Sequence, residues 1–399
     1  MRALRVAVVA EFYPREGDPV LGVWAHRQAL AAQAAGAEVQ VLVLHRLVPP
    51  RASLAQGPGG AVRALGGLAG EQRRQTRDGI AVTYVRYVSP PRARGYASWG
   101  AWAAPGLGVA LRRLQRTWGF ELVHAHNAVP AGDAVLRARV DVPLVVSVHG
   151  GDVLYTARRG EAGASAVRRG LSGARLVLAN SRGVAELARA DGARETRVVH
   201  LGTDLPELTR VTQARKLGGA ALVTVAHLVG RKRHADVLRA VAVLGRKHPA
   251  LRYVIIGDGP ERVALEGLAI RLGIAERVEF RGALEPAEAL AQARRCTLLV
   301  MPSTDEAFGV AYVEAMAAGM PAIGCRGEPG PEEIAAAGDG FVLVPPGDIE
   351  RLSQRIDELL SDPQRLREAG RRARETVAAH FTWERCGEQT VAAYEQALR

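Results

Sequence analysis

Short apolar runs alternate with longer helix-forming segments along most of this chain. A short, continuous apolar run is typical of a parallel strand that is covered on both faces. The runs that predict such strands lie at 4–10, 38–44, 80–88, 121–126, 144–148, 176–181, 197–204, 221–226, 252–257, 277–282, 297–303 and 341–346. The segments that predict helices include 24–35, 234–245, 349–360, 363–379 and 383–398. This alternation predicts an α/β fold with mostly parallel sheets.

Two stretches depart from that alternation. Residues 204–219 contain Pro206 and a polar run, which is typical of a linker between domains. A chain of 399 residues is long enough for two domains with a core each, so we predict a first domain over 1–205 and a second over 206–380. The other stretch, 49–78, is rich in Pro, Gly, Ala and Arg and predicts a long mobile loop.

Composition is that of an ordinary folded protein. Apolar residues make up 48% and charged residues 24% of the chain, as in soluble globular domains. No run approaches the roughly 18 apolar residues that a membrane span needs, and the first strand lacks a signal peptide's cleavage pattern. We therefore expect a cytoplasmic location. The three cysteines, Cys296, Cys325 and Cys386, are too few and too scattered for a disulfide framework or a thiolate metal site.

Charge is distributed unevenly along the chain. The formal net charge is +12, and all of this excess lies in residues 1–205, because acidic and basic residues balance in 206–399. We therefore expect the first half to meet an anionic partner, such as a membrane surface, a lipid phosphate or a polyanionic polymer.

Two glutamates frame a helical segment in the second half. Glu306 and Glu314 stand eight positions apart, and a helix-forming run that opens at 308–310 is stopped by Gly319 and Pro321. At about 1.5 Å per residue, eight residues span roughly 12 Å, which matches the distance from the hexose of a nucleotide sugar to its ribose. The start of the helix would meet the diphosphate between them. The alternative is a solvated amphipathic helix with two incidental glutamates.

Several polar or glycine positions follow predicted strands of the first half. Gly22 forms a turn that faces the end of the first strand, where a backbone can approach a ligand closely. His124 and His126 alternate on one strand, but no third residue at a suitable spacing predicts a metal site. His149 ends strand 144–148, where open α/β sheets place ligands, and Asp152 could bond to it or to an acceptor. A structural role for a single turn glycine or a single histidine is the alternative.

Arginines and aromatic residues gather between 92 and 116. Arg94, Trp99 and Trp102 belong to this stretch, which leads into a helix with three further arginines. Basic residues beside aromatic rings suit a membrane interface. A solvated helix face with tryptophans in the core remains the alternative.

Basic residues also cluster after strand 221–226, in the sequence His-Leu-Val-Gly-Arg-Lys that ends at Lys232. Positive side chains disfavour the start of a helix unless an anion is present, so the cluster favours an anion site. The tight turn at Gly257, in Gly-Asp-Gly-Pro, is a weak signal by itself.

Residues 306–321 resemble the signature of retaining glycosyltransferases of family 4, which is Glu, seven residues, then Glu-Ala-Met-Ala-x-Gly-x-Pro. The resemblance implies that Glu306 contacts the transferred sugar and Glu314 the nucleotide ribose. Residues 226–233 are similar to the family's Gly-Arg-Leu-x-x-x-Lys-Gly, whose Arg and Lys neutralise the donor diphosphate in place of a metal. Lys232 matches the Lys, but His227 stands at the Arg position and Arg233 at the Gly. Arg231 or Arg233 would then supply the second cation.

The resemblance covers nearly the whole chain and implies the GT-B fold, two doubly wound Rossmann-like domains facing each other across a cleft. The helix at 381–399 would cross back to the first domain. It also implies a donor-sugar contact for His149. The expected site residues are His149, Glu306 and Lys232 for catalysis; Gly22, His227, Arg231, Lys232, Gly257, Glu306, Phe308, Gly309, Val310 and Glu314 for the donor; and Asp152, Trp99 and Arg94 on the acceptor side.

The function that the resemblance implies is retaining, metal-independent transfer of a hexose from a nucleotide diphosphate sugar to a hydroxyl. The acceptor would be a glycan or lipid-linked, in cell-surface polysaccharide or glycolipid synthesis. No cofactor, metal or nucleic acid is expected. We do expect peripheral attachment to an anionic membrane. A nucleotide-sugar epimerase of the same fold, or a non-catalytic nucleotide-sugar-binding protein, remains as an alternative.

Overall fold

The computed structural model describes residues 3–15, 18, 20–48, 59, 73–207 and 219–399. The chain forms two compact units. Unit 1 comprises residues 1–199 and 386–399, and unit 2 comprises residues 200–385. The sequence placed these boundaries at 205/206 and 380/381. Most of the predicted loop at 49–78 lies outside the described residues.

Among the described residues, unit 1 is built on an eight-stranded sheet in the order β3-β4-β2-β1-β5-β6-β7-β8. All neighbouring strands are parallel except β3 and β4, which pair antiparallel. The strands are β1 (Arg5–Ala10), β2 (Glu38–Arg46), β3 (Arg74–Arg77), β4 (Ile80–Tyr87), β5 (Leu122–His126), β6 (Leu144–Val148), β7 (Leu176–Ala179) and β8 (Thr196–Val198).

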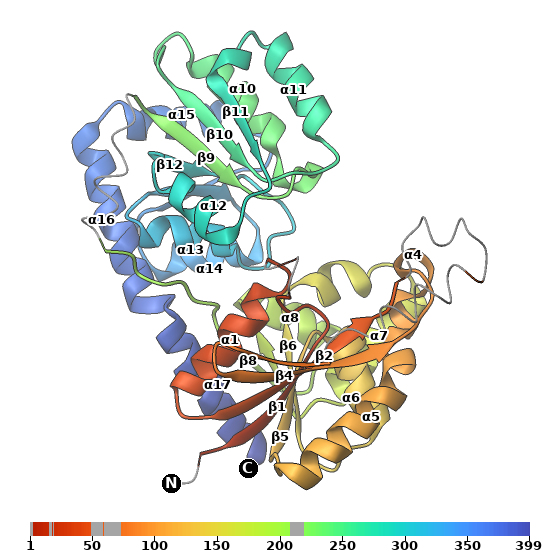
Figure 1. Ribbon diagram of the computed structural model, residues 1–399. Coiled ribbons are helices and arrows are strands. Elements are labelled where there is room, and N and C mark those ends of the chain that lie inside the picture. The colour runs from red at the N-terminus through yellow and green to blue at the C-terminus, as the bar shows by residue number, and fades with distance from the viewer. Residues whose placement is uncertain (1–2, 16–17, 19, 49–58, 60–72, 208–218) are drawn as a thin grey trace. The chain divides into compact units, whose positions relative to one another are not determined.

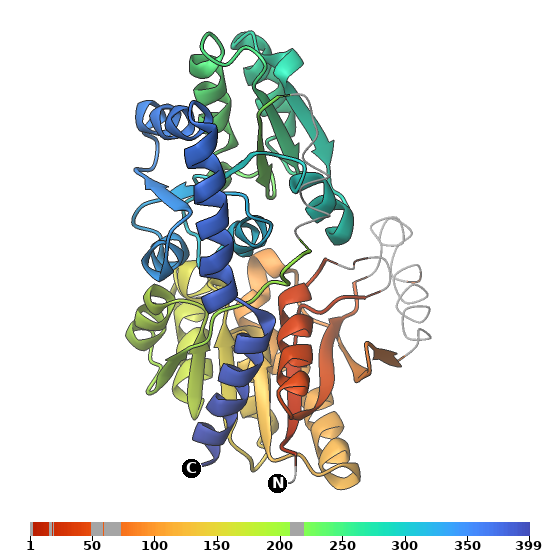
Figure 2. The ribbon, with the colours of Figure 1, turned by 90° about the vertical axis from the view of Figure 1, so that its left-hand side faces the viewer.

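Helices cover both faces of this sheet (Figure 1). They are α1 (Val23–Ala34), α4 (Arg92–Gly95), α5 (Trp99–Thr117), α6 (Asp133–Ala138), α7 (Glu161–Ser172), α8 (Arg182–Ala190) and α17 (Trp383–Leu398), with the short turns η1 (Tyr96–Ser98), η2 (Ala128–Gly132) and η3 (Gly151–Thr156). Helices α1 and α17 lie side by side (Figure 2), and Gln28 Nε2 donates to Thr390 Oγ1 at 3.1 Å between them.

The apolar runs form strands because a parallel sheet covered on both faces hides every side chain from water. Val6 to Ala10 are fully buried, and so are most residues of β5 and β6. One expectation was wrong: Arg74–Arg77 is not a structureless loop but the edge strand β3. Its sequence, Arg-Gln-Thr-Arg, carries no apolar signal, so backbone pairing with β4 makes it a strand.

Among the described residues, unit 2 has a six-stranded, fully parallel sheet in the order β11-β10-β9-β12-β13-β14. The strands are β9 (Ala221–Val225), β10 (Arg252–Ile256), β11 (Val278–Gly282), β12 (Leu298–Val300), β13 (Ala322–Cys325) and β14 (Phe341–Val344). The helices are α10 (His234–Leu244), α11 (Arg262–Arg271), α12 (Pro286–Ala293), α13 (Val310–Ala317), α14 (Pro329–Ala337), α15 (Ile349–Leu360) and α16 (Pro363–His380), with turns η4 (Gly230–Lys232) and η5 (Ala275–Arg277).

The core of unit 2 joins the sheet to α10, α11 and α15. Helices α13 and α16 pack together where two glycines meet, since a Cβ on Gly370 would lie 2.3 Å from the carbonyl oxygen of Gly319. Each unit is therefore a doubly wound parallel α/β domain, as predicted. No helix in the described part of the chain is long and apolar enough to cross a membrane.

Candidate active site

The strand order of unit 2 reverses between β9 and β12. From β9 the chain builds outward to β10 and β11 on one side and to β12, β13 and β14 on the other. Open α/β sheets bind ligands at the carboxyl ends of the strands at such a switch point. The loop after β9 carries η4, and the loop after β12 carries residues 301–309. The two loops are joined by a backbone bond of 2.8 Å from Thr304 N to the carbonyl oxygen of Arg231.

Lys232 and Glu306 meet at this switch point. Lys232 Nζ donates to Glu306 Oε2, and each residue is only 9% exposed. Ser303 Oγ donates to the same carboxylate oxygen at 3.0 Å. Burial lowers the pKa of Lys232, and the nearby Arg231 lowers it further, while the Glu306 carboxylate opposes both effects. A buried cation and a buried anion therefore stand together where a ligand is expected.

The loop that carries Glu306 is fixed by several hydrogen bonds. Glu306 N donates to Glu328 Oε2 at 2.9 Å, and Gly330 N donates to the carbonyl oxygen of Glu306 at 3.0 Å. Ser303 Oγ lies 3.1 Å from the hydroxyl of Tyr312, which donates to the carbonyl oxygen of Met301. Ser303, Tyr312 and Glu328 are not among the predicted site residues, and each acts by holding this loop.

Gly309 starts helix α13 in a conformation that other residues adopt poorly. Its φ is 90°, in the left-handed region, and an added Cβ would lie 2.3 Å from the Tyr312 ring. The helix begins at Val310, so residues 306–309 do not follow the helical rise, and the predicted 12 Å helical span from Glu306 to Glu314 is wrong in its geometry. Glu314 lies half-buried in the second turn of α13. The start of this helix carries the backbone N–H groups expected of an anion site.

Other donor-side candidates have structural roles of their own. The Phe308 ring is buried between His200 and Phe381, with ring centroids 6.0 and 5.7 Å away. Gly257 has a φ of 140°, and an added Cβ would lie 2.0 Å from the carbonyl oxygen of Ala226. Close backbone approach therefore explains this glycine whether or not a ligand binds beside it.

The structure distinguishes the residues that could supply the second positive charge beside Lys232. The exposed imidazole of His227 lies 3.1 Å from the carbonyl oxygen of Asp258 through Nδ1. Arg233 adopts a left-handed φ of 56°, and its guanidinium pairs with Asp236 at 2.5 Å. Arg231 is half-buried beside Lys232, so it is the better placed of the two arginines.

In unit 1, His149 lies at the end of β6 within a row of histidines. Its Nε2 is 3.0 Å from His126 Nδ1, and the two rings stack with centroids 5.3 Å apart. Burial lowers the pKa of His149 to about 4 and that of His126 well below its usual value. His149 Nδ1 and His126 Nε2 are buried without a hydrogen-bond partner in the described structure. His149 is therefore neutral at physiological pH and retains a nitrogen for a ligand.

His124 differs from its neighbours, because both of its nitrogens are satisfied. Nε2 lies 2.7 Å from Ser147 Oγ, and Nδ1 lies 2.8 Å from the Tyr394 hydroxyl of α17. The alternation of His124 and His126 thus has a structural explanation. A Cβ on Gly22 would lie 2.1 Å from the backbone of Phe12, so close packing of this loop accounts for that glycine.

The acceptor-side predictions change in the structure. Asp152 does not bond to His149; it accepts from Ala128 N and Val129 N at 3.1 Å each and holds the loop after β5. Burial raises the pKa of Asp152 to about 6. Trp99 is 4% exposed and donates from Nε1 to Pro90 O at 2.9 Å, so it belongs to the core and not to a ligand surface. The side chain of Arg94 lies outside the described residues.

One buried acid of unit 1 was not predicted. Glu11 follows β1 directly, and its carboxylate accepts from the Tyr96 hydroxyl at 2.8 Å. A charged residue immediately after an apolar strand is the signal that could have identified it, because strand ends in such sheets face ligands.

Two doubly wound units with polar residues at their switch points define a two-domain α/β protein of the ligand-binding type. Residues 21–207 match the family model described as "Glycosyltransferase Family 4", and residues 208–376 match "Glycosyl transferases group 1". Together these models span most of the chain. The chain belongs to glycosyltransferase family 4, and its fold is of the GT-B type.

Relatives and solved structures agree with this assignment. An exopolysaccharide phosphotransferase of Streptomyces coelicolor is 34% identical over 202 residues, which are 50% of this chain and only 21% of that protein. Glycogen synthase of Mycobacterium tuberculosis is 27% identical over 306 residues, 73% of each chain. Among structures, sucrose-phosphate synthase of Thermosynechococcus elongatus has a TM-score of 0.77 at 22% identity, over 98% of both chains. HepE of Anabaena, in complex with UDP and glucose, has a TM-score of 0.71 at 19% identity, over 98% of this chain and 99% of that one. These structures share the fold.

Proposed function

We propose that this glycosyltransferase is retaining and metal-independent. It would move a hexose from a nucleotide diphosphate sugar to a hydroxyl of a glycan or lipid-linked acceptor, in cell-surface polysaccharide or glycolipid synthesis. The observation that carries the proposal is the buried pair of Lys232 and Glu306 at the switch point of unit 2. A cation suits a diphosphate and a carboxylate suits sugar hydroxyls, so both chemistries of a nucleotide sugar are present in one site.

Each residue has a role in this proposal. Lys232 and the N–H groups at the start of α13 stabilise the diphosphate as charge develops on it, in place of a metal ion. Glu306 accepts hydrogen bonds from the hexose, and Glu314 accepts them from the ribose. Arg231 adds a second positive charge next to Lys232. A further structure of Anabaena HepE, similar to this chain, is a complex with UDP-glucose, which is a nucleotide diphosphate sugar as proposed here.

The proposed reaction proceeds on one face of the sugar. The acceptor hydroxyl attacks the anomeric carbon as the bond to the diphosphate breaks, and the departing phosphate oxygen takes the hydroxyl proton. His149 stays neutral throughout, since burial lowers its pKa to about 4, and its Nδ1, which has no hydrogen-bond partner in the described structure, is available to a hexose hydroxyl. No covalent intermediate is needed.

A screen of nucleotide sugars for thermal stabilisation, followed by a transfer assay with and without EDTA, tests the proposal. Lys232→Ala should lose most of the activity, because one cation at a developing diphosphate contributes several kcal/mol. Lys247→Ala is the matched control, since Lys247 forms an exposed ion pair with Asp357 and should lose nothing. A need for Mn²⁺ together with tolerance of Lys232→Ala would refute the assignment. An isomerised donor sugar formed without any acceptor would point to an epimerase.

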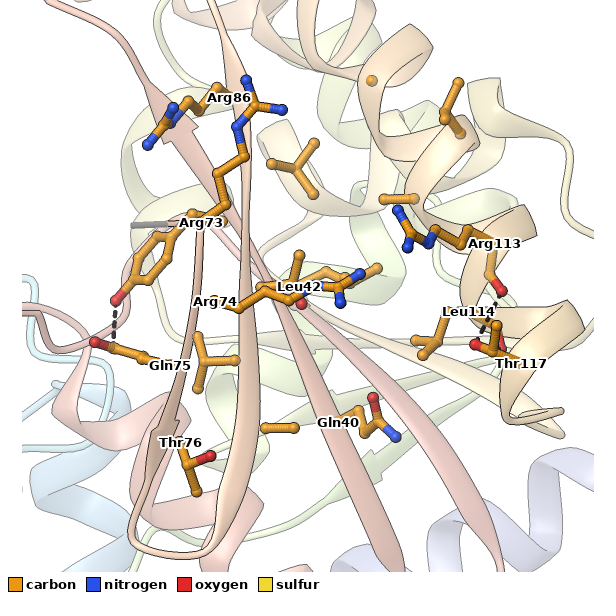
Figure 3. Close-up of a pocket in the computed structure, with 18 residues that line it drawn as sticks. Gln40, Leu42, Arg73, Arg74, Gln75, Thr76, Arg86, Arg113, Leu114 and Thr117 are labelled. Atoms are coloured by element: carbon orange, nitrogen blue, oxygen red, sulfur yellow. Dashed lines mark hydrogen bonds between the residues drawn. The ribbon is translucent and has the colours of Figure 1, made fainter. Parts of the chain in front are cut away.

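The anionic partner of unit 1 is the second part of the proposal. A groove of about 1270 Å³ lies between the β3–β4 hairpin and α5 (Figure 3), and its lining includes the apolar residues Leu42, Val82 and Leu114. Its described lining contains arginines and no acidic residue; the arginines are Arg73, Arg74, Arg86 and Arg113. Val109, which lines the groove, is 63% exposed, and Trp102, near the start of the same helix α5, is 50% exposed. Charge and exposed apolar surface together support contact of this face with an anionic membrane.

Vesicle sedimentation tests this contact. The full chain should bind vesicles that contain anionic lipid, and binding should weaken as added salt shortens the Debye length from about 10 Å at 0.1 M to about 3 Å at 1 M. Arg74→Gln with Arg113→Gln should weaken binding, whereas the same charge change at the exposed Arg246 and Arg271 of unit 2 should not. Equal loss from both pairs, or no binding at low salt, would contradict this part of the proposal.

A further inference from the structure

Unit 1 has its own switch point, which the proposed donor roles leave largely unused. Its strand order reverses between β1 and β5, so the loops after these two strands flank the position where a ligand is expected. Glu11 is the first residue after β1, and Asn127 is the first after β5. The donor's nucleotide is assigned to unit 2, which leaves this position for the other substrate.

Glu11 is a buried acid whose partners offset its charge only in part. Its side chain is 8% exposed, Arg92 Nη1 lies 3.7 Å from Oε1, and the Tyr96 hydroxyl donates to Oε2 at 2.8 Å. The other two buried acids of the described part of unit 1 are better satisfied. Asp133 pairs with two arginines at 2.9 and 3.2 Å, and Asp152 accepts from two backbone N–H groups. Contacts within the fold therefore satisfy those two acids more fully than they satisfy Glu11.

The hydrogen bonds around Glu11 differ between its two protonation states. The Tyr96 hydroxyl has one proton and two acceptors, Glu11 Oε2 and the carbonyl oxygen of Val129 at 3.0 Å. A protonated Glu11 can donate to Tyr96, whose proton then goes to Val129. An ionised Glu11 accepts the hydrogen bond from the Tyr96 hydroxyl and keeps its remaining lone pairs for another donor. The protonated form also keeps an acceptor oxygen, but the hydrogen bond that a carboxylate accepts from a ligand hydroxyl is charge-assisted and therefore stronger.

The surroundings suit a sugar. The ring of Phe12, the next residue, lies 6.2 Å from the Trp24 ring, and the Arg92 guanidinium lies over Phe12 and Tyr96 at 5.2 and 4.2 Å. Aromatic faces beside a carboxylate offer apolar contact to a pyranose ring and hydrogen bonds to its hydroxyls. The charged and titratable groups that face Glu11 are Arg46, Tyr87, Arg92, Tyr96 and Asp152.

We propose that Glu11, held by Tyr96 and Arg92 at the switch point of unit 1, binds a hydroxyl of a sugar acceptor and does so in its ionised form. This inference rests on the proposed function and adds the class of acceptor, a neutral pyranose with a free hydroxyl to donate. Burial raises the pKa of Glu11 to about 7, so this carboxyl changes its charge within the physiological range. Acceptor affinity should therefore rise with pH across that range.

Glu11→Gln tests the inference, because it keeps the size of the side chain and removes the charge. An acceptor is first found by screening the full chain against an oligosaccharide array, a readout that needs no donor. Losing a charged acceptor of a hydrogen bond should weaken glycan binding and raise the acceptor KM roughly ten- to a hundredfold. The donor KM should stay within twofold. Glu38→Gln, on the surface beside Arg5, is the matched control and should change neither value.

The pH profile separates a binding role from a merely structural one. In the wild type, kcat/KM for the acceptor should rise through about pH 7, and Glu11→Gln should abolish that rise. Tyr96→Phe removes a hydrogen bond that lowers the Glu11 pKa, so it should move the midpoint to higher pH.

An unchanged acceptor KM and pH profile in a folded Glu11→Gln protein would overturn the inference while leaving the transferase assignment intact. Wild-type protein that binds glycans through Glu11 but turns over no nucleotide sugar would overturn only the proposed function. A wild type that binds no glycan on the array would overturn the inference.

Discussion

The pair of Lys232 and Glu306 makes a quantitative prediction about stability. In Lys232→Met, the Glu306 carboxylate stays buried with Ser303 as its remaining side-chain donor. Leaving one charge of a buried pair unmatched typically costs about 3–5 kcal/mol. In the double variant Lys232→Met, Glu306→Gln, neither charge remains and the new side-chain amide can still accept from Ser303. The double variant should therefore cost clearly less than the sum of the two single variants, by about 2–4 kcal/mol.

The Glu306→Gln variant also has a predictable pH dependence. Burial already lowers the pKa of Lys232 in the folded protein, and removing the carboxylate removes the largest effect that opposes this shift. Because a base with a lowered folded pKa favours the neutral state in the fold, the free energy of unfolding should rise as pH increases toward the unfolded pKa of lysine. Lys232→Met has no such group and should lack this rise.

Urea unfolding and hydrogen exchange measure these quantities together. Four of the five tryptophans lie in unit 1, so fluorescence reports mainly that unit, whereas exchange at β9 and β12 amides reports unit 2 directly. Lys247→Met is the control, because its partner Asp357 is on the surface and such pairs contribute at most about 1 kcal/mol. If the two single effects add to the double within about 0.5 kcal/mol, the pair is not coupled and the reasoning fails.

Three other predictions address single residues of the two sites. Glu314→Ala should weaken binding of both the nucleotide sugar and the free nucleoside diphosphate roughly ten- to a hundredfold. Glu306→Ala should leave the affinity for free nucleotide unchanged and lower kcat. If calorimetry shows that both variants lose the same affinity for free nucleotide, the roles proposed for the two glutamates are wrong. Gly309→Ala should destabilise unit 2 by at least about 1–2 kcal/mol, since its φ is 90° and the new Cβ would meet Tyr312; an unchanged urea midpoint would contradict this. Glu11→Gln should stabilise the protein at pH 8 by up to about 3 kcal/mol, because the pKa of Glu11 is raised from 4.5 to about 7 in the fold. This gain in stability should vanish below pH 4.5, where the carboxyl is protonated in both states. A variant less stable than wild type at pH 8 would show that the fold requires the charge.

The sequence by itself determined the α/β class and the family. Apolar runs such as 144–148 became strands at their predicted positions, because a short run that is apolar at every position satisfies a strand covered on both faces. The segment 306–321 identified family 4, since its glycines, proline and glutamates must keep a fixed spacing along one loop and one helix. Gly309 is an example, because a side chain at this position would collide with the ring of Tyr312, three residues further along the chain.

Tertiary structure alone decided which distant residues meet. Lys232 and Glu306 are 74 positions apart, and they pair because β9 and β12 are neighbours at a switch point, which follows from the strand order and not from any local pattern. The same applies to Glu11, whose partner Tyr96 is 85 positions away. The fold also decides which side chains are buried, since Trp99 lies in the core although its sequence context suits a membrane interface. The carboxylate of Asp152 accepts its hydrogen bonds from backbone N–H groups of the loop after β5. A sequence records spacing along the chain, whereas contact, desolvation and charge pairing depend on distances that only the folded sheets define.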